Sequence, residues 1–182
     1  MLKTKRLLTY EDYAGLTDDT RYELLNGELY MVPSPNFYHQ SFLRNLGVSL
    51  WHFVKENSLG LVFFAPFDVV LTDHDIVQPD IIFVSNERKA IVTEKNIKGA
   101  PDILIEILSP GTRERDLLFK KVLYARHGIK EYWIADPIEK NIEVMVLREG
   151  SFETHAIFLS EDHFESPSLP GFTPLLEEIF SV

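Results

Sequence analysis

The sequence predicts a mixed α/β (α+β) fold, in which helices flank a mixed β-sheet. The predicted elements run helix, hairpin, helix, several strands, helix, several strands, an order typical of this class. Two predicted strands, residues 77–84 and 102–108, carry apolar runs, continuous over residues 81–84 in the first and broken only by Glu106 over residues 103–108 in the second, as expected of strands buried on both faces. The chain has 182 residues, of which 45% are hydrophobic and 12% aromatic, enough to fill one sizeable core. Without repeats or linkers, we expect a single domain over residues 1–182.

The chain opens with a short helix and a hairpin. Thr9 at the N-cap and Asp12 three residues later form a capping-box pattern, so a helix should run to about Gly15. Residues 22–32 contain two apolar arms around Asn26-Gly27, the preferred pair for a type I′ turn. These residues predict an N-terminal hairpin.

A long helix is predicted over residues 36–57, ended by Gly60. Its apolar residues recur at helical spacing: Phe42, Leu46, Leu50, Phe53 and Val54. Trp51 in this helix, and Trp133 further on, are expected to belong to the core.

The middle of the chain alternates short strands with turns. Pro66 separates two short strands, and residues 85–98 form a charged surface loop with a short helix. The predicted strands are residues 61–64, 67–71, 77–84 and 102–108.

Thr112 is positioned to cap a helix that Gly128 stops. A strand over residues 131–135 should follow, then a C-terminal hairpin formed by residues 141–148 and 152–158. The apolar segment 175–180 is expected to dock on the body of the protein.

Charge and composition limit the function. The net charge of −10 argues against nucleic-acid binding through a broad basic surface, although a few Lys and Arg side chains around a metal can still hold phosphates. The absence of cysteine excludes disulfides, thiolate zinc sites and cysteine nucleophiles, so any metal must sit on oxygen or histidine. No long apolar run or leader is visible, and we expect a soluble, cytoplasmic protein with no membrane contact.

Acidic residues on apolar strands are the main functional signal. Asp80 precedes the apolar run of one strand, and Glu106 lies inside the next. A buried carboxylate must be paired, protonated or bound to a metal. Lys120 and Lys121 are the nearest cations in sequence. The residues therefore allow two interpretations, a divalent-metal site or a buried Glu106–Lys120 ion pair alone.

The helix after Thr112 has one polar face. Asp116, Lys120 and His127 are spaced by four and seven residues, so Lys120 can point back at the strand ends. On the other side, apolar side chains are expected to pack the helix: Leu117, Leu118 and Tyr124.

Several nearby residues are secondary candidates. Asp102 shares a strand face with Glu106 and is an alternative metal ligand to Asp80, or a solvated acid at a strand entrance. Gln78 can position a water or phosphate, or simply enter the strand. His39 can donate to a phosphate or act as a base, or be structural.

Three further polar residues lie at the start of the last helix. Arg113 and Arg115 can clamp phosphates or form a solvated face. Ser109 can cap the turn or contact the metal shell, and capping is favoured.

Beyond these physical arguments, the chain resembles the Uma-type restriction-endonuclease family within the PD-(D/E)XK nuclease superfamily. The likeness covers almost the whole chain in the same order, including YELLNGE at residues 22–28, VQPD at 77–80 and APDILIEILSP at 100–110. The other matching positions are His39, Asp116, Lys120, Tyr124, residues 128–137 and residues 170–172.

The resemblance implies a restriction-endonuclease-like core that holds Mg²⁺ or Mn²⁺. Carried over by position, Glu23, Asp80 and Glu106 would be the metal-binding and catalytic acids. The superfamily lysine would stand two residues after Glu106, where this chain has Leu108. The resemblance moves that role to Lys120, with Lys121 as the alternative.

The function implied is a metal-dependent endonuclease that hydrolyses phosphodiester bonds of nucleic acid, DNA rather than RNA. A homodimer would suit it, since double-strand cleavage often pairs two sites. Two other functions stay open: a non-catalytic domain that binds nucleic acid or protein on the same fold, and a phosphohydrolase acting on small substrates.

Overall fold

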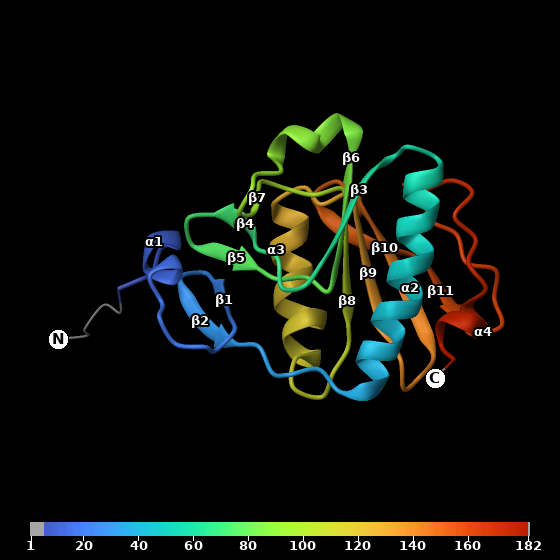
Figure 1. Ribbon diagram of the computed structural model, residues 1–182, viewed down its shortest axis with the longest axis horizontal. Helices are drawn as coiled ribbons and strands as arrows, with labels where there is room; N and C mark the ends of the chain where they lie inside the picture. Colours follow the sequence, from blue (N-terminus) through green and yellow to red (C-terminus); the bar gives the residue numbers. More distant parts are fainter. Residues whose placement is uncertain (1–5, 182) are drawn as a thin grey trace.

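The computed structural model describes residues 6–181 and confirms the mixed α+β class. The strands are divided between two sheets with helices around them (Figure 1). No helix among residues 6–181 combines the length and apolar character needed to cross a membrane.

The larger sheet has six strands in the order β11-β10-β9-β8-β6-β3. Its central strands β8 and β9 are parallel, and the other neighbours are antiparallel. The strands are β3 Gly60–Phe64, β6 Ile81–Ser85, β8 Ile103–Ile107, β9 Glu131–Asp136, β10 Asn141–Arg148 and β11 Ser151–Leu159. The predicted C-terminal hairpin, β10 with β11, is therefore confirmed.

The smaller sheet has five strands in the order β2-β1-β5-β4-β7. Only β4 and β7 are parallel. The strands are β1 Tyr22–Leu25, β2 Glu28–Met31, β4 Val69–Thr72, β5 Asp75–Val77 and β7 Ile97–Lys98.

The prediction of one continuous strand over residues 77–84 was wrong. Strand β5 ends at Val77 in the smaller sheet, and β6 begins at Ile81 in the larger sheet. Pro79 lies between them, and a proline has no N–H to donate to a sheet ladder. The chain therefore passes from one sheet to the other at residues 78–80, and Asp80 lies at this junction.

The larger sheet is covered on both faces, which explains its nearly continuous apolar strands. On one face, Ile103, Ile105 and Ile107 pack with helix α2, Phe37–Glu56, and with the C-terminal segment. On the other, Leu104 packs with α3, Lys121–Arg126, and with the smaller sheet. Figure 1 shows α2 and α3 on opposite sides of the strands.

The N-terminal elements match their sequence signals. Thr9 caps helix α1, Tyr10–Ala14, and Asp12 completes the capping box. Asn26 and Gly27 both have positive φ, 50° and 73°, as a type I′ turn requires. Helix α2 is capped by Asn36 and ends at Asn57. Gly60 instead opens β3, where a Cβ would collide with the carbonyl oxygen of Val84.

The predicted helix after Thr112 forms, but with an unexpected geometry. A π-helical segment, η2 (Arg115–Lys120), leads directly into α3. Thr112 directly precedes the first helical residue, Arg113, and its hydroxyl lies 3.0 Å from Ser109 Oγ. Gly128, with φ of 76°, follows the helix as predicted.

Three other local predictions have mixed outcomes. The loop 85–98 contains the short 3₁₀ helix η1, Asn86–Ile91, and the tail docks through α4, Leu176–Ile179, as expected. Trp133 is fully buried, but Trp51 is 40% exposed and Leu118 58% exposed, so neither belongs to the core. Both lie on outward faces of helices whose other faces supply the packing.

Candidate functional site

The predicted acids meet where the two sheets join. Glu23 comes from β1, Asp80 from the junction, Glu106 from β8 and Lys120 from the end of η2. All four line one cavity of about 60 Å³, which holds roughly two water molecules. Gln78, His39, Ser109, Thr112 and Asp116 also contribute to its wall.

Lys120 is the centre of this cluster. Its Nζ lies 2.8 Å from Glu23 Oε1 and 2.9 Å from Glu106 Oε1. It also lies 3.2 Å from Asp116 Oδ1, one turn earlier on the same helix. The lysine is buried, and the three carboxylates together hold its pKa well above the usual value although burial alone would lower it.

Glu106 is buried with excess negative charge around it. Burial raises its pKa well above the ordinary value, and the nearby carboxylates add to that rise against the opposing charge of Lys120. The Tyr124 hydroxyl donates a 2.7 Å hydrogen bond to Glu106 Oε1, the same oxygen that accepts from Lys120. Among the described residues no donor reaches Oε2, so this oxygen remains open to a ligand.

Asp80 is fixed from two directions. Its Oδ2 accepts a 2.8 Å hydrogen bond from the main-chain N–H of Ile107, which ties the junction to β8. Its Oδ1 lies 3.2 Å from Nε2 of His39, in the first turn of α2. Nδ1 of His39 is buried with no hydrogen-bond partner among residues 6–181. The predicted histidine is therefore a direct neighbour of a predicted metal ligand.

Glu23 holds the remaining side of the cavity. Besides Lys120, its Oε1 accepts the main-chain N–H of Gln78 at 2.9 Å, and Arg115 lies 3.6 Å from Oε2. The Gln78 side chain bonds to Arg21, at 3.1 Å, and to Asp68. Gln78 thus anchors the passage between the sheets.

The donor set fits a hard divalent cation. Four carboxylates and two permanent cations, Arg21 and Lys120, line the cavity, so its wall carries excess negative charge on oxygen atoms even with Arg115 beside Glu23. As the side chains lie, no group of three His, Asp or Glu residues within the described chain is arranged to hold a metal. Mg²⁺ commonly takes only one or two carboxylates and completes its shell with water and substrate phosphate. Asp80 and Glu106 satisfy that smaller requirement.

Other candidates lie outside the cavity. Asp102 Oδ2 accepts the main-chain N–H of Ser85 at 2.7 Å, and Lys130 lies 2.7 Å from Oδ1. Asp102 is therefore ion-paired at the far end of β8, neither solvated nor beside Asp80. Lys121 does not line the cavity, whereas Lys120 does.

Of the candidates on residues 109–127, some line the cavity and others lie outside it. Arg113 donates a 2.6 Å hydrogen bond to Asp136. Ser109 stays in the wall of the cavity. His127 lies 3.9 Å from Asp75 of the smaller sheet, the sheet whose Glu23 contacts Lys120, but His127 does not line the cavity.

Two contributors to the site were not identified as such from the sequence. Asp116 is a third carboxylate on Lys120, and its spacing of four from that lysine was the available signal. Tyr124 was expected to pack the helix, but its hydroxyl also contacts Glu106. No sequence pattern distinguishes that hydroxyl from an ordinary core tyrosine.

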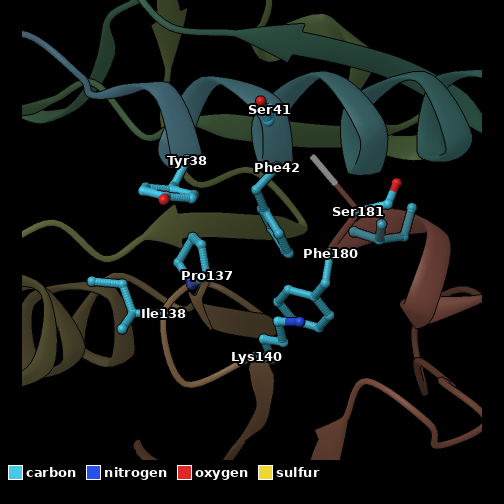
Figure 2. Close-up of a pocket in the computed structure, with 9 residues that line it drawn as sticks. Tyr38, Ser41, Phe42, Pro137, Ile138, Lys140, Phe180 and Ser181 are labelled. Carbon is cyan, nitrogen blue, oxygen red and sulfur yellow. The ribbon is translucent and has the colours of Figure 1, made fainter.

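A separate apolar cavity of about 360 Å³ lies beside the start of α2 (Figure 2). Tyr38 and Phe42 project into it from the helix, opposite Pro137, Ile138 and Phe180. Its lining contains no carboxylate or histidine, so acid-dependent chemistry belongs to the smaller polar cavity.

Comparisons with known proteins agree with the fold. A sequence model of the Uma2 family, described as "Putative restriction endonuclease", matches residues 7–178. A crystal structure from Anabaena variabilis, described as a putative nuclease belonging to DUF820, superposes with a TM-score of 0.79. It shares 21% sequence identity over 95% of this chain and 97% of that chain, a likeness of fold. No protein of curated function matches the sequence.

Proposed function

The chain belongs to the Uma2 family of restriction-endonuclease-type proteins, and on this premise we propose that it cleaves DNA phosphodiester bonds with Mg²⁺ or Mn²⁺. One observation carries the proposal: a buried ammonium, Lys120, lies within 3 Å of Glu106, on a cavity wall shared with Asp80. Two acids and a lysine on rigid elements are the groups that metal-assisted phosphodiester hydrolysis needs.

Asp80 and Glu106 are the proposed metal ligands. When bound there, the ion would polarise a phosphoryl oxygen and lower the pKa of a coordinated water. Glu106 offers its open Oε2, and Asp80 is held in place by the N–H of Ile107. Glu23 is the third acid by resemblance, and in the absence of metal it holds Lys120. We propose that it supports the site chiefly by fixing that lysine.

The remaining side chains act on water and phosphate. Lys120 orients the attacking water and stabilises negative charge as it develops on the phosphoryl oxygens. The water oxygen loses a proton to solvent and bonds to phosphorus while the bond from phosphorus to O3′ breaks and O3′ takes up a proton, leaving a 5′-phosphate and a 3′-hydroxyl. His39, whose Nε2 lies 3.2 Å from Asp80 Oδ1, is placed to donate a hydrogen bond to a phosphate oxygen.

Substrate binding must be local, given the net charge of −10. The 60 Å³ cavity admits the ion and a water, and the phosphodiester would remain at its mouth. Arg21 and Lys120 are the cations that line the cavity, and Arg113 and Arg115 lie outside it on the helix that carries Lys120. Arg115 is mostly buried beside Glu23, and Arg113 is paired with Asp136. Arg21, which lines the cavity and donates to the Gln78 side chain, is therefore the better candidate for a phosphate contact.

A non-catalytic binding domain is the second candidate, and one observation favours it. Lys120 already neutralises part of the acid cluster without a metal, which is what a purely structural ion-pair network would do.

Calorimetric titration with Mn²⁺ distinguishes the two candidates. The wild type should bind saturably, whereas Asp80→Asn and Glu106→Gln should reduce binding at least tenfold, the loss of about 1.4 kcal/mol expected when a charged ligand is removed. Asp102→Asn is the matched control, because it neutralises a buried acid outside the cavity. The titration is repeated with DNA present, since substrate phosphate can complete a weak site.

Cleavage is then assayed on supercoiled plasmid with Mg²⁺ or Mn²⁺. Loss of nicking in both site variants and its retention in Asp102→Asn would support the proposal. Full metal-dependent nicking by Glu106→Gln would contradict it. DNA binding that depends on salt but not on metal, without nicking, would favour the binding domain.

A further inference from the structure

We propose that the outer face of η2 and α3 is a homodimer interface, in which the helices of two copies pack antiparallel about a twofold axis near residue 120. This inference concerns assembly and does not rest on the proposed nuclease activity.

The helix separates its two faces sharply. Its inner side carries the buried Asp116, Lys120 and Tyr124. Its outer side presents Leu118, Phe119 and Val122, which are 58%, 54% and 61% exposed. Three large apolar side chains within five residues form a contiguous patch, and such patches commonly mark interaction surfaces.

The patch borders a surface groove of about 510 Å³. Four residues spaced by four line it in order along the helix: Glu114, Leu118, Val122 and Arg126. A negatively charged residue, Glu114, therefore lies at one end of the apolar patch, and a positively charged residue, Arg126, lies at the other. Neither charge has an ion-pair partner within residues 6–181.

This order is complementary to itself when reversed. About a twofold axis near residue 120, Glu114 of one copy faces Arg126 of the other, and Leu118 faces Val122. Every contact occurs twice, as a twofold interface requires. A parallel arrangement would bring Glu114 onto Glu114 and Arg126 onto Arg126, so charge favours the antiparallel pairing.

The same charges disfavour nucleic acid as the occupant. The groove offers one cation, Arg126, against one acid, Glu114, and its centre is apolar. A phosphate backbone would gain little from this face. A second copy satisfies both charges and covers the apolar residues together.

Sedimentation velocity over a concentration series tests the interface without metal or substrate. The wild type should approach twice the monomer mass of 21.0 kDa. Leu118→Glu should be monomeric. Ile157→Glu is the matched control, because Ile157 is an equally exposed (57%) apolar residue on β11, and this variant should remain dimeric.

Charge reversal tests the pairing itself. Glu114→Arg and Arg126→Glu should each raise the dissociation constant on the order of tenfold, because two attractive pairs become repulsive. The double reversal, Glu114→Arg with Arg126→Glu, should restore wild-type association. A monomeric wild type, a dimer that survives Leu118→Glu, or a double reversal no tighter than the single variants would overturn the proposal.

Discussion

The ammonium of Lys120 lies 2.8 Å from Glu23 Oε1, and both side chains are buried. Lys120 comes from the helix that covers the larger sheet, and Glu23 from the first hairpin of the smaller sheet. One ion pair therefore joins the two sheets at the point where the proposed chemistry takes place, and its loss should affect both stability and activity.

Lys120→Met should destabilise the protein by about 3–5 kcal/mol at neutral pH, because removing one partner leaves buried carboxylates uncompensated. Burial already raises the pKa of Glu106 and of Asp116, and loss of the lysine raises them further. In the folded variant these carboxyls stay protonated at pH values where the unfolded chain has already released its protons, above about pH 4.3. The free energy of unfolding of the variant therefore falls as the pH rises from there.

Urea unfolding at about pH 5 and about pH 8 checks this prediction. The free energy of unfolding should fall further below that of the wild type at the higher pH. Lys121→Met is the control, since that lysine lies outside the cavity. Equal stability of the two variants at neutral pH would show that the ion-pair cluster contributes nothing.

Metal affinity should increase with pH. A Glu106 carboxyl whose pKa is raised by burial must lose its proton before it binds a cation. Mn²⁺ affinity should therefore decline as the pH falls, starting above the ordinary pKa of a glutamate, with proton release on binding. Calorimetry in two buffers of different ionisation enthalpy measures that release. Proton release of the same size in Glu106→Gln would assign it to another group.

Tyr124→Phe removes the 2.7 Å hydrogen bond to Glu106 and should cost about 1–3 kcal/mol of stability. Because the hydroxyl donates to the carboxylate, its loss raises the pKa of Glu106, and metal binding then requires a higher pH. Tyr132→Phe is the matched control, since it also removes a buried hydroxyl, one that donates to the main-chain oxygen of Asp116 at 3.0 Å and not to Glu106. Both variants should lose stability, but only Tyr124→Phe should shift the pH dependence of Mn²⁺ binding.

Asp102→Asn should cost about 1–3 kcal/mol at neutral pH and leave Mn²⁺ affinity unchanged. Burial would raise the pKa of Asp102, but Lys130 and the Ser85 N–H outweigh it and hold the pKa below the ordinary value. The stabilisation is present above about pH 3.9 and is lost as pH falls through the lowered pKa. The deficit measured by urea unfolding should thus shrink in acid. A variant that also lost Mn²⁺ binding would place Asp102 in the metal site.

Local sequence patterns predicted the elements whose causes are local. The Thr9 capping box, the Asn26-Gly27 turn and the apolar spacing of α2 each depend on residues within a few positions of one another. Asp80 and Glu106 could be singled out for a similar reason, since an acid beside or inside an apolar strand requires a partner wherever the strand lies.

The features missed depend on tertiary packing. Periodicity shows that residues 77–84 are extended, but it cannot show that Pro79 divides them between two sheets. Asp102 has the same sequence context as Asp80, a preceding proline and an apolar strand after it. Only the placement of Lys130 reveals that it is an ion-pair partner.

The passage of the chain between sheets at residues 78–80 has a consequence for the protein during its synthesis. The groups of the proposed site are drawn from positions 23, 80, 106 and 120, and Glu23, which belongs to the smaller sheet, contacts Lys120 of the helix that covers the larger sheet. A nascent chain that has been synthesised only as far as Glu106 contains neither Lys120 nor the helix that carries it. An enzyme built this way would be harmless to nearby nucleic acid until the whole site had closed.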